Sequence, residues 1–220
     1  MTGTFSEPEL TRLSGCLARL MPHVHRDEIA LTGGVAIQLG LAALGRTGSR
    51  TAIADLDFVL SRVDAIAATV TESFLVSHYH AAGMGGPKFM IQLVDPISRL
   101  RLDMFPDLAG SLARAQPTMI GAQAVNVLDL QSILDHKLGT LPSAWRREET
   151  IDPKHYRDAQ TLGTIFGREV PVAPKGSLVE DVYGGEADLH CRRCELSRTE
   201  RFPLAPKPQI FELLGWAPTP

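Results

Sequence analysis

Three aspartates in this sequence have the types and spacing that could hold a cation. Asp55 and Asp57 are separated by one residue, and Asp103 lies in a later run of alternating hydrophobicity. Because successive side chains of a strand point to opposite faces, Asp55 and Asp57 would project from one face and share a cation between their oxygens. Asp103, on a separate strand, would supply a third ligand. The pattern therefore predicts a cation site built from three carboxylates.

A pair of glycines precedes these aspartates at a point where anion binding is feasible. Gly33 and Gly34 follow Thr32, where a short apolar strand predicted at 28–32 gives way to an apolar helix at 35–44. At such a turn, backbone N–H groups and the positive end of the helix can receive a phosphate without a side chain in the way. The simpler alternatives are that the pair is only a tight turn and that the D-x-D spacing arose by chance.

The elements that must position these residues follow from hydrophobic periodicity. Ser6 begins a capping-box pattern that predicts a helix over 7–21, with Cys16 beside its apolar stripe. Further strands and one helix follow in the order strand 53–60, helix 63–70, strand 74–79, strands 89–94 and 99–105 joined as a hairpin at Asp95-Pro96, and a last strand at 118–128. Asp103 falls on the second arm of that hairpin.

The second half of the chain predicts two helices and then an irregular tail. Asp129 can cap one helix, and Asp152 with Pro153 opens another that runs to about residue 166. Seven of the 15 prolines fall within residues 171–220, which predicts a segment with little regular structure. The expected fold is α/β, with a mixed β-sheet flanked by helices over 1–128, a short helical lobe over 129–167 and a proline-rich tail over 168–220.

The composition describes a globular, mildly acidic chain. Of its 220 residues, 44% are hydrophobic and 21% are charged, and the formal net charge is −3. No overall positive charge indicates binding to long nucleic acids or membranes, and no stretch approaches the roughly 18 apolar residues of a membrane span. Three unevenly placed cysteines form no disulfide framework. We therefore expect a cytoplasmic protein without a membrane partner.

The glycine pair and the three aspartates together resemble the nucleotidyltransferase superfamily. In that superfamily a G-G or G-S turn opens a helix, D-x-D follows on the next strand, and a third carboxylate lies on a later strand. The similarity extends over about residues 25–165 and is closest to the AbiEii-type branch of toxin-like nucleotidyltransferases, whose downstream helices carry lysines. The segments QSILDHKL and DPKHYRDAQTL correspond to those helices.

The resemblance implies specific roles for these residues. Asp55 and Asp57 would bind two Mg²⁺ ions, and Asp103 would be the third metal ligand and the candidate base. Gly33 and Gly34 would contact the triphosphate of ATP or another nucleoside triphosphate. The branch often carries an arginine four positions before its first aspartate, whereas Arg50 here stands five before Asp55.

Two lysines in the predicted lobe have two interpretations. Lys137 shares a helix face with Ile133 and Leu134, and Lys154 lies in the first turn of its helix, where the helix dipole disfavours a cation. Both lysines could neutralise a triphosphate, as the resemblance also implies. The alternative is an internal ion pair between Lys137 and Asp158 that joins the two helices.

The tail carries one C-x-x-C motif, formed by Cys191 and Cys194. Two thiolates at this spacing are a local geometry for Zn²⁺, but a tetrahedral site needs further ligands from elsewhere. A zinc site in the tail and a pair of free or redox-active thiols are therefore both open.

These features predict a Mg²⁺-dependent enzyme that transfers a nucleoside monophosphate from a nucleoside triphosphate to an acceptor. The acceptor could be an RNA end, a protein hydroxyl or a small molecule, and the AbiEii likeness implies a toxin-antitoxin or phage-defence role with a cognate protein partner. One alternative is a catalytically silent nucleotide-binding or partner-binding module of the same fold. Another is a glycosyltransferase whose D-x-D holds Mn²⁺ and a nucleotide sugar, which the early glycine turn and short chain disfavour.

Overall fold

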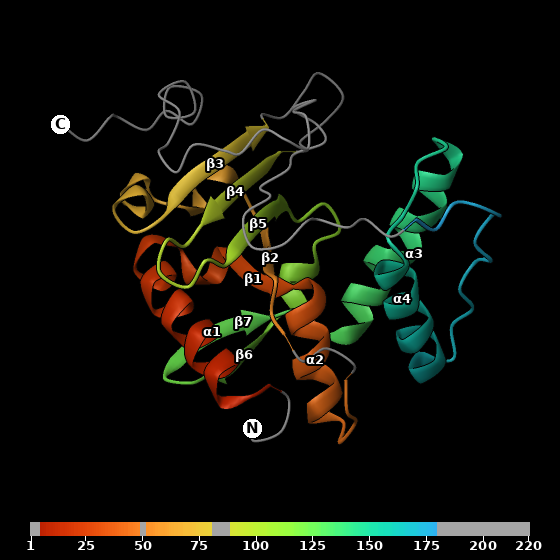
Figure 1. The fold of residues 1–220 in the computed structure, drawn as a ribbon, viewed down its shortest axis with the longest axis horizontal. Helices are drawn as coiled ribbons and strands as arrows, with labels where there is room; N and C mark the ends of the chain where they lie inside the picture. The colour runs from red at the N-terminus through yellow and green to blue at the C-terminus, as the bar shows by residue number, and fades with distance from the viewer. Residues whose placement is uncertain (1–4, 49–51, 81–88, 180–220) are drawn as a thin grey trace. The chain divides into compact units, whose positions relative to one another are not determined.

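A computed structural model of the chain describes residues 5–48, 52–80 and 89–179, without the side chains of residues 78–80. The chain divides into two compact units (Figure 1). The first, called here the sheet unit, lies within Met1–Leu128. The second, the helical unit, lies within Asp129–Tyr183.

The sheet unit is built on one mixed sheet of seven strands in the order β3-β4-β5-β2-β1-β7-β6 (Figure 1). The strands are β1 (Ile29–Thr32), β2 (Asp55–Leu60), β3 (Leu75–His80), β4 (Met90–Val94), β5 (Arg101–Pro106), β6 (Gln116–Ile120) and β7 (Gln123–Val127). The pairs β2 with β5 and β1 with β7 are parallel, and the remaining neighbours are antiparallel. The expected α/β fold with a mixed sheet and flanking helices is confirmed, as is the hairpin of β4 and β5.

Two predicted elements of the sheet unit are wrong. The single strand expected over 118–128 is a hairpin of β6 and β7, because Gly121 takes a positive φ of 59° and turns the chain. The helix expected over 63–70 is two 3₁₀ turns, Val63–Ala65 and Ala68–Glu72. The residues between them form a bridge in which Ile66 pairs with Val24, and this backbone pairing interrupts a continuous helix.

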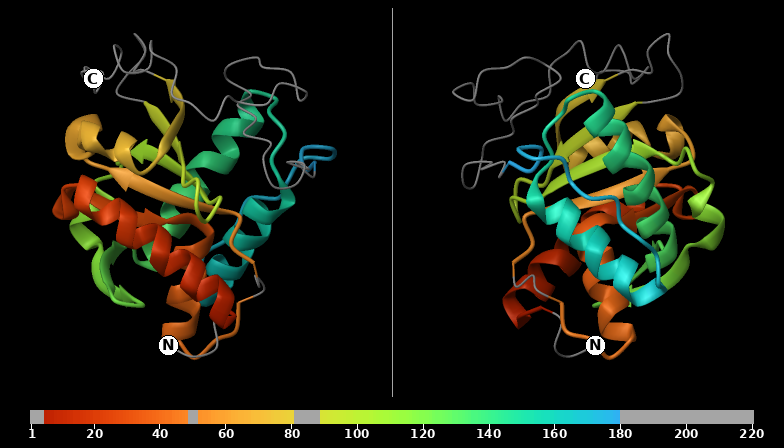
Figure 2. Two further views of the ribbon diagram at one scale, coloured as in Figure 1. Left: turned by 60° about the vertical axis from the view of Figure 1, so that its left-hand side comes forward. Right: turned by 90° about the vertical axis from the view of Figure 1, so that its right-hand side faces the viewer.

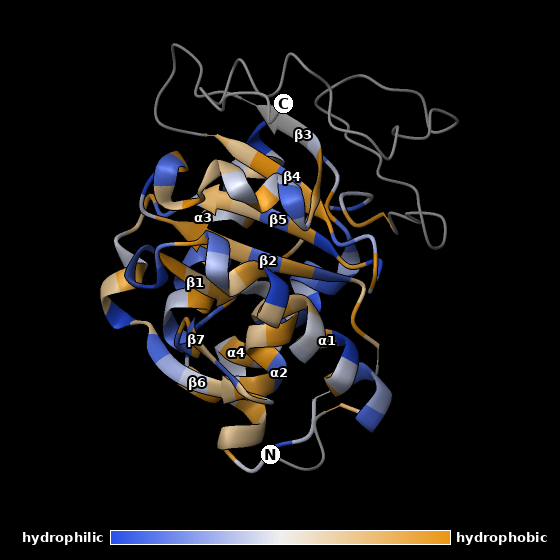
Figure 3. Cartoon of the chain, turned by 90° about the vertical axis from the view of Figure 1, so that its left-hand side faces the viewer, coloured by the Kyte–Doolittle hydropathy of each residue, from blue (hydrophilic) through white to orange (hydrophobic). Residues whose placement is uncertain are grey.

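Among the described residues, two α-helices pack on the sheet, α1 (Glu7–Leu20) and α2 (Gly33–Ala43). The apolar stripe of α1 is buried as expected, with Cys16 beside it, although the side chain of Ser6 makes no capping hydrogen bond. Helix α2 is almost entirely apolar and, with the central strands, carries much of the hydrophobic core (Figure 3). The two helices lie next to each other in both views of Figure 2.

A buried ion pair joins α1 to the turn between β4 and β5. Asp95 is fully buried and accepts hydrogen bonds from the guanidinium of Arg19, the hydroxyl of Ser98 and the amide of Ile97. Burial opposes the charge of Asp95, but these hydrogen bonds outweigh it and lower its pKa below the ordinary value. Burial, with the nearby charge of Asp95, raises the pKa of the Cys16 thiol to about 12.

We expect Asp95→Asn to lower the free energy of unfolding by about 2 kcal/mol at pH 7, because the amide cannot replace the charge that pairs with Arg19. A lowered pKa contributes stability above the ordinary pKa and loses it as pH falls. The difference from the wild type should therefore shrink below about pH 4. Urea denaturation at several pH values measures it, with the exposed Asp64→Asn as control. Equal stability of Asp95→Asn and Asp64→Asn at pH 7 would contradict the expectation.

The helical unit consists of α3 (Leu130–Arg146) and α4 (Pro153–Phe166). Both predicted caps are present, because Asp129 accepts a hydrogen bond from the amide of Ser132 and Asp152 accepts one from the amide of Lys154. A small apolar core between the helices includes Leu141, Ala144, Ile151, Ala159, Trp145 and Tyr156. From 168 to 179 the chain has no helix or strand beyond a single bridge of Leu178 with Ile151, in agreement with the expected irregular tail.

Candidate active site

The register of the sheet aligns Thr32, Asp57 and Asp103 in one row across three neighbouring strands. Thr32 of β1 pairs with Asp57 of β2, and Asp57 pairs with Asp103 of β5. Directly paired residues of a sheet project from the same face, and Asp55 shares that face because it lies two residues before Asp57. The three aspartates of the sequence prediction are therefore brought to one face of β2 and β5.

Gly33, the first residue of α2, lies against the carboxylate of Asp57. Its φ is 65°, and a Cβ atom built on it would stand 1.9 Å from Oδ2 of Asp57. Only glycine satisfies both the backbone conformation and this close approach. The turn that was expected to receive a phosphate thus places the N-terminus of α2 next to one of the carboxylates, with Gly34 as the second residue of the helix.

A guanidinium lies between the other two carboxylates. Nη2 of Arg101 is 2.7 Å from Oδ2 of Asp55 and 3.0 Å from Oδ2 of Asp103. Arg101 shares the face of the aspartates because it pairs with Asp55 across β2 and β5 and lies two residues before Asp103. The space between Asp55 and Asp103 is therefore a cation site that the protein fills with one of its own side chains.

Two buried polar residues orient Asp103. The amide nitrogen of Gln92 on β4 donates to Oδ1 of Asp103 at 2.9 Å, and the hydroxyl of Ser77 on β3 lies 2.9 Å from Oε1 of Gln92. The carboxylate oxygen accepts, so the nitrogen end of the Gln92 amide faces it, and the Ser77 hydroxyl donates to the oxygen end. Burial raises the pKa of Asp103, and the charge of Asp55 adds to the rise, while Arg101 and Gln92 oppose it.

Helix α1 fixes the segment that leads into β2. Nη2 of Arg12 donates to the carbonyl of Ile53 at 2.6 Å, and the amide of Ile53 donates to Oε2 of Glu9 at 2.8 Å. Glu9 and Arg12 also pair with each other at 2.8 Å. Helix α1 thus holds both the carbonyl and the amide of Ile53, which lies two positions before Asp55. These contacts fix the start of β2.

In the helical unit, Lys137 of α3 pairs with Asp158 of α4. Nζ of Lys137 is 3.2 Å from Oδ2 of Asp158, and the two side chains are only 14% and 13% exposed. This contact is the internal ion pair expected in one of the two interpretations of Lys137. Lys154 lies 3.9 Å from Asp152. His155 is an exposed residue, yet desolvation by the surrounding atoms, together with the charges of Lys137 and Lys154, lowers its pKa to about 4.

Other predicted residues lie outside the described part of the chain. Arg50, Cys191 and Cys194 belong to the segments 49–51 and 180–220. Within the described ranges, no three His, Cys, Asp or Glu side chains are gathered as a metal site. The aspartates nevertheless suit a divalent cation, because carboxylates are hard oxygen donors. Asp55 and Asp103 also already hold a cation between them, the guanidinium of Arg101.

Sequence reasoning missed the polar partners of the aspartates. Arg101 could have been found, because it stands two residues before Asp103 in an alternating run and must share its face. Gln92 required the register of the β4 and β5 hairpin, in which it pairs with Asp103. The clamp that Glu9 and Arg12 place on Ile53 has no local sequence signal, because it joins residues more than forty positions apart.

We expect Gly33→Ala to disrupt this site, because alanine would have to displace the carboxylate of Asp57 as well as adopt a positive φ. Gly45→Ala is a matched control, since Gly45 has φ 68° and a Cβ added there would meet no atom within 4 Å. The control should cost about 1 kcal/mol of stability and Gly33→Ala clearly more. Thermal unfolding of both variants measures the difference. Equal melting temperatures would contradict the close approach of Asp57.

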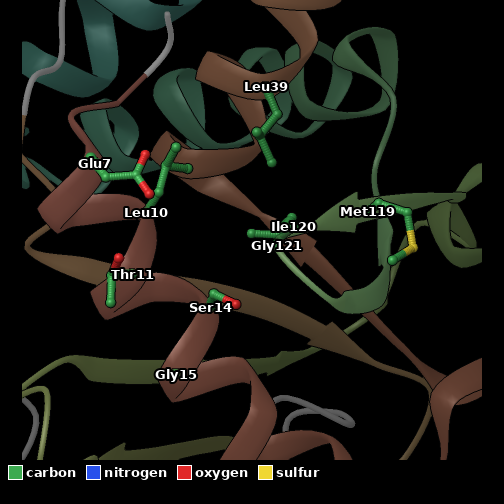
Figure 4. A pocket seen from close by; sticks show the side chains of 9 residues that line it. All are labelled: Glu7, Leu10, Thr11, Ser14, Gly15, Leu39, Met119, Ile120 and Gly121. Atoms are coloured by element: carbon green, nitrogen blue, oxygen red, sulfur yellow. The ribbon is translucent and has the colours of Figure 1, made fainter. Parts of the chain in front are cut away.

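A groove elsewhere on the sheet unit is a poor candidate for the same chemistry. It lies between α1, α2 and the turn of β6 and β7, and its lining includes Leu10, Ser14, Leu39, Met119 and Ile120 (Figure 4). The groove is mainly apolar, and none of the three aspartates lines it.

Among the described residues, no helix has both the length and the hydrophobicity needed to span a membrane.

Comparisons with known proteins give structural similarities only. No family model matches the chain, and no curated protein matches it. A putative nucleotidyltransferase from Thermotoga maritima has 15% identity and a TM-score of 0.44, with 64% of this chain and 92% of that chain covered. An antigenic nucleotidyltransferase-like protein from Paracoccidioides brasiliensis has 19% identity and a TM-score of 0.40, with 79% and 81% covered. A putative nucleotidyltransferase from H. pylori has 17% identity and a TM-score of 0.31, with 60% and 59% covered.

Proposed function

We propose that this protein is a Mg²⁺-dependent nucleotidyltransferase that transfers a nucleoside monophosphate from a nucleoside triphosphate to an acceptor hydroxyl. The observation that carries the proposal is the alignment of Asp57 with Asp103 across β2 and β5, with Asp55 on the same face and the N-terminus of α2 beside Asp57. Carboxylates that hold a cation next to a helix N-terminus that accepts an anion suit a metal-bound triphosphate.

Asp55, Asp57 and Asp103 are the residues that would hold Mg²⁺. When bound, Mg²⁺ supplies charge neutralisation of the triphosphate and a lower pKa for the acceptor hydroxyl. The protein's part is to fix the carboxylates: Gln92 orients Asp103, and Glu9 and Arg12 hold the chain that leads to Asp55. Such prior positioning supports catalysis because the charges need not reorganise during the reaction.

Gly33 and Gly34 are proposed to contact the triphosphate through their backbone N–H groups, and Lys137 and Lys154 to neutralise it. The acceptor oxygen forms a bond to the α-phosphorus while the bond from that phosphorus to the bridging oxygen of the β-phosphate breaks. Pyrophosphate leaves, and the hydroxyl proton passes to a carboxylate or to water. The pairing of Lys137 with Asp158 means that Lys137 would reach a phosphate only by sharing or leaving that partner.

The finer assignment to the AbiEii-type branch is part of this proposal. It is supported by the order of the motifs and by the lysine-bearing helices α3 and α4, which contain QSILDHKL and DPKHYRDAQTL. It would give the protein a role in a toxin-antitoxin or phage-defence system, a cytoplasmic location and a cognate protein partner.

The test is release of pyrophosphate from each of the four ribonucleoside triphosphates, with Mg²⁺ or with EDTA. Each reaction is run with an RNA end, a hydroxyl-bearing protein mixture or small hydroxyl compounds as acceptor. We expect release from at least one pair of nucleotide and acceptor in Mg²⁺ and none in EDTA. Nucleotide that binds but yields no pyrophosphate with any acceptor would contradict transferase activity.

A second candidate function is a catalytically silent nucleotide-binding or partner-binding module. The observation that favours it is the contact of Arg101 with both Asp55 and Asp103, because a permanent guanidinium between these carboxylates would keep a divalent cation out. The two candidates differ in metal binding. A silent module of this kind would show no response to Mg²⁺ or Mn²⁺, with or without nucleotide.

A further inference from the structure

Arg101 is the one cation in contact with the proposed metal ligands among the described ion pairs. We propose that Arg101 is an exchangeable internal cation: it holds Asp55 and Asp103 in the empty protein, leaves them when a divalent cation binds, and then pairs with the phosphates of the bound nucleotide. This inference rests on the proposed function and adds a nucleotide-recognition residue that also sets the metal affinity of the site.

The empty site needs a positive charge between two of its carboxylates. Asp55 and Asp103 project from one face and would repel each other if both were ionised without a cation. The side chains of Arg101, Asp55 and Asp103 are only 18%, 21% and 12% exposed, so water screens them weakly. Arg101 thus offsets this repulsion and allows the two carboxylates to lie close together before any metal arrives.

Arg101 and a divalent cation would compete for the same carboxylate oxygens. Nη2 of Arg101 contacts Oδ2 of Asp55 and Oδ2 of Asp103, and a cation bound between these carboxylates would use the same lone pairs. Arg101 and a divalent cation therefore cannot both occupy this position. Binding of the metal includes the cost of displacing the guanidinium, which lowers the metal affinity of the wild type.

Once displaced, the guanidinium of Arg101 needs a new anionic partner. A released guanidinium in a weakly solvated site requires a new anion, because an unpaired buried charge is costly. Arg101 stays attached to β5 on the face that carries the three aspartates. The anion that the proposed reaction brings to this face is a triphosphate, and the planar fork of arginine pairs well with phosphate oxygens.

The experiment compares the wild type with Arg101→Gln, which removes the charge, and Arg101→Lys, which keeps the charge but loses the fork. Arg147→Gln is the matched control, because Arg147 is exposed and belongs to the helical unit. Mn²⁺ binding without nucleotide is measured by electron paramagnetic resonance. We expect Arg101→Gln to bind Mn²⁺ roughly tenfold more tightly than the wild type, with Arg101→Lys between them and the control unchanged.

A second arm measures the affinity for an α,β-methylene nucleoside triphosphate at saturating Mn²⁺. Arg101→Gln should bind this nucleotide at least about fivefold more weakly than the wild type, because it lacks the guanidinium that would pair with phosphate. If Arg101 had a purely structural role, or if the variant were partly misfolded, the affinities for metal and for nucleotide would both fall. Opposite changes in the two affinities would therefore not arise from either cause. Arg101→Lys retains the charge next to Asp55 and Asp103, so it is the variant to compare with the wild type if Arg101→Gln does not fold.

The outcomes separate this inference from the proposed function. If the wild type binds Mn²⁺ and Arg101→Gln binds it no more tightly, the exchange is wrong and the proposed function stands. If Mn²⁺ affinity rises but nucleotide affinity does not fall, the transfer of Arg101 to phosphate is wrong. If neither the wild type nor the Arg101 variants bind Mn²⁺, both the inference and the proposed function fail.

Discussion

Replacing Asp57 by asparagine is expected to reduce metal-dependent pyrophosphate release on the order of a thousandfold while the protein stays folded. Asp57 is the central carboxylate of the row, paired with Thr32 on one side and Asp103 on the other. Asparagine keeps the size of the side chain and one neutral oxygen, but it loses the negative charge that holds a hard cation. Pyrophosphate release at saturating Mg²⁺ and nucleotide measures the loss.

The control for this variant is Asp64→Asn, an exposed aspartate of the same unit. Asp64→Asn should leave pyrophosphate release unchanged. The free energy of unfolding of Asp57→Asn without metal should stay within about 1 kcal/mol of the wild type, since removing one of several like charges relieves repulsion. Undiminished release by folded Asp57→Asn would contradict the assignment of the three aspartates.

The second large effect is expected in the helical unit, where Lys137→Met should lower the free energy of unfolding by about 2 kcal/mol. The variant keeps the length of the apolar stem but removes the ammonium that lies 3.2 Å from Asp158. Because both side chains are mostly shielded from water, solvent screens the pair poorly. Urea denaturation measures the change, and Lys154→Met, whose lysine is farther from its carboxylate, should lose less than about 0.5 kcal/mol.

His155 gives a second readout of the same pair. Its pKa is lowered to about 4 by desolvation and by the charges of Lys137 and Lys154. Removing either lysine should raise the pKa of His155 toward its ordinary value, which a proton NMR titration of the imidazole measures. Unchanged stability together with an unchanged His155 titration in Lys137→Met would show that the ion pair does not form in solution.

Hydrophobic periodicity predicted burial better than it predicted the type of element. The spacing of Val63, Ile66 and Val70 predicts a helix, and Ile66 and Val70 are indeed buried. The segment nevertheless forms two 3₁₀ turns, with Ile66 between them in a backbone bridge. The single strand predicted over 118–128 is interrupted at Gly121, where the chain turns to form a hairpin. The predicted helix caps are confirmed, since Asp129 and Asp152 both cap their helices. These contacts could be predicted because they depend on neighbouring residues alone.

The candidate site was predictable as far as strand alternation and order of motifs could lead. Those features predicted that Asp55 and Asp57 share a face and that Asp103 lies on a separate strand, and the register of β2 and β5 places all three on one face. The pairing of Arg101 with Asp55 depends on β2 and β5 being parallel neighbours, and no local pattern specifies which strands lie side by side. The three carboxylates were therefore predictable from the sequence, whereas the position of Arg101 between Asp55 and Asp103 was not.

Binding of an α,β-methylene nucleoside triphosphate, followed by calorimetry, tests the central claim most directly because it needs no acceptor. Wild type, Asp57→Asn and Asp103→Asn are titrated with each nucleotide analogue in Mg²⁺ and in EDTA. The account predicts at least about tenfold tighter binding in Mg²⁺ for the wild type, no metal effect for Asp57→Asn and a reduced one for Asp103→Asn. The same affinity for all three proteins, with and without Mg²⁺, would contradict a metal-dependent nucleotide site at these aspartates.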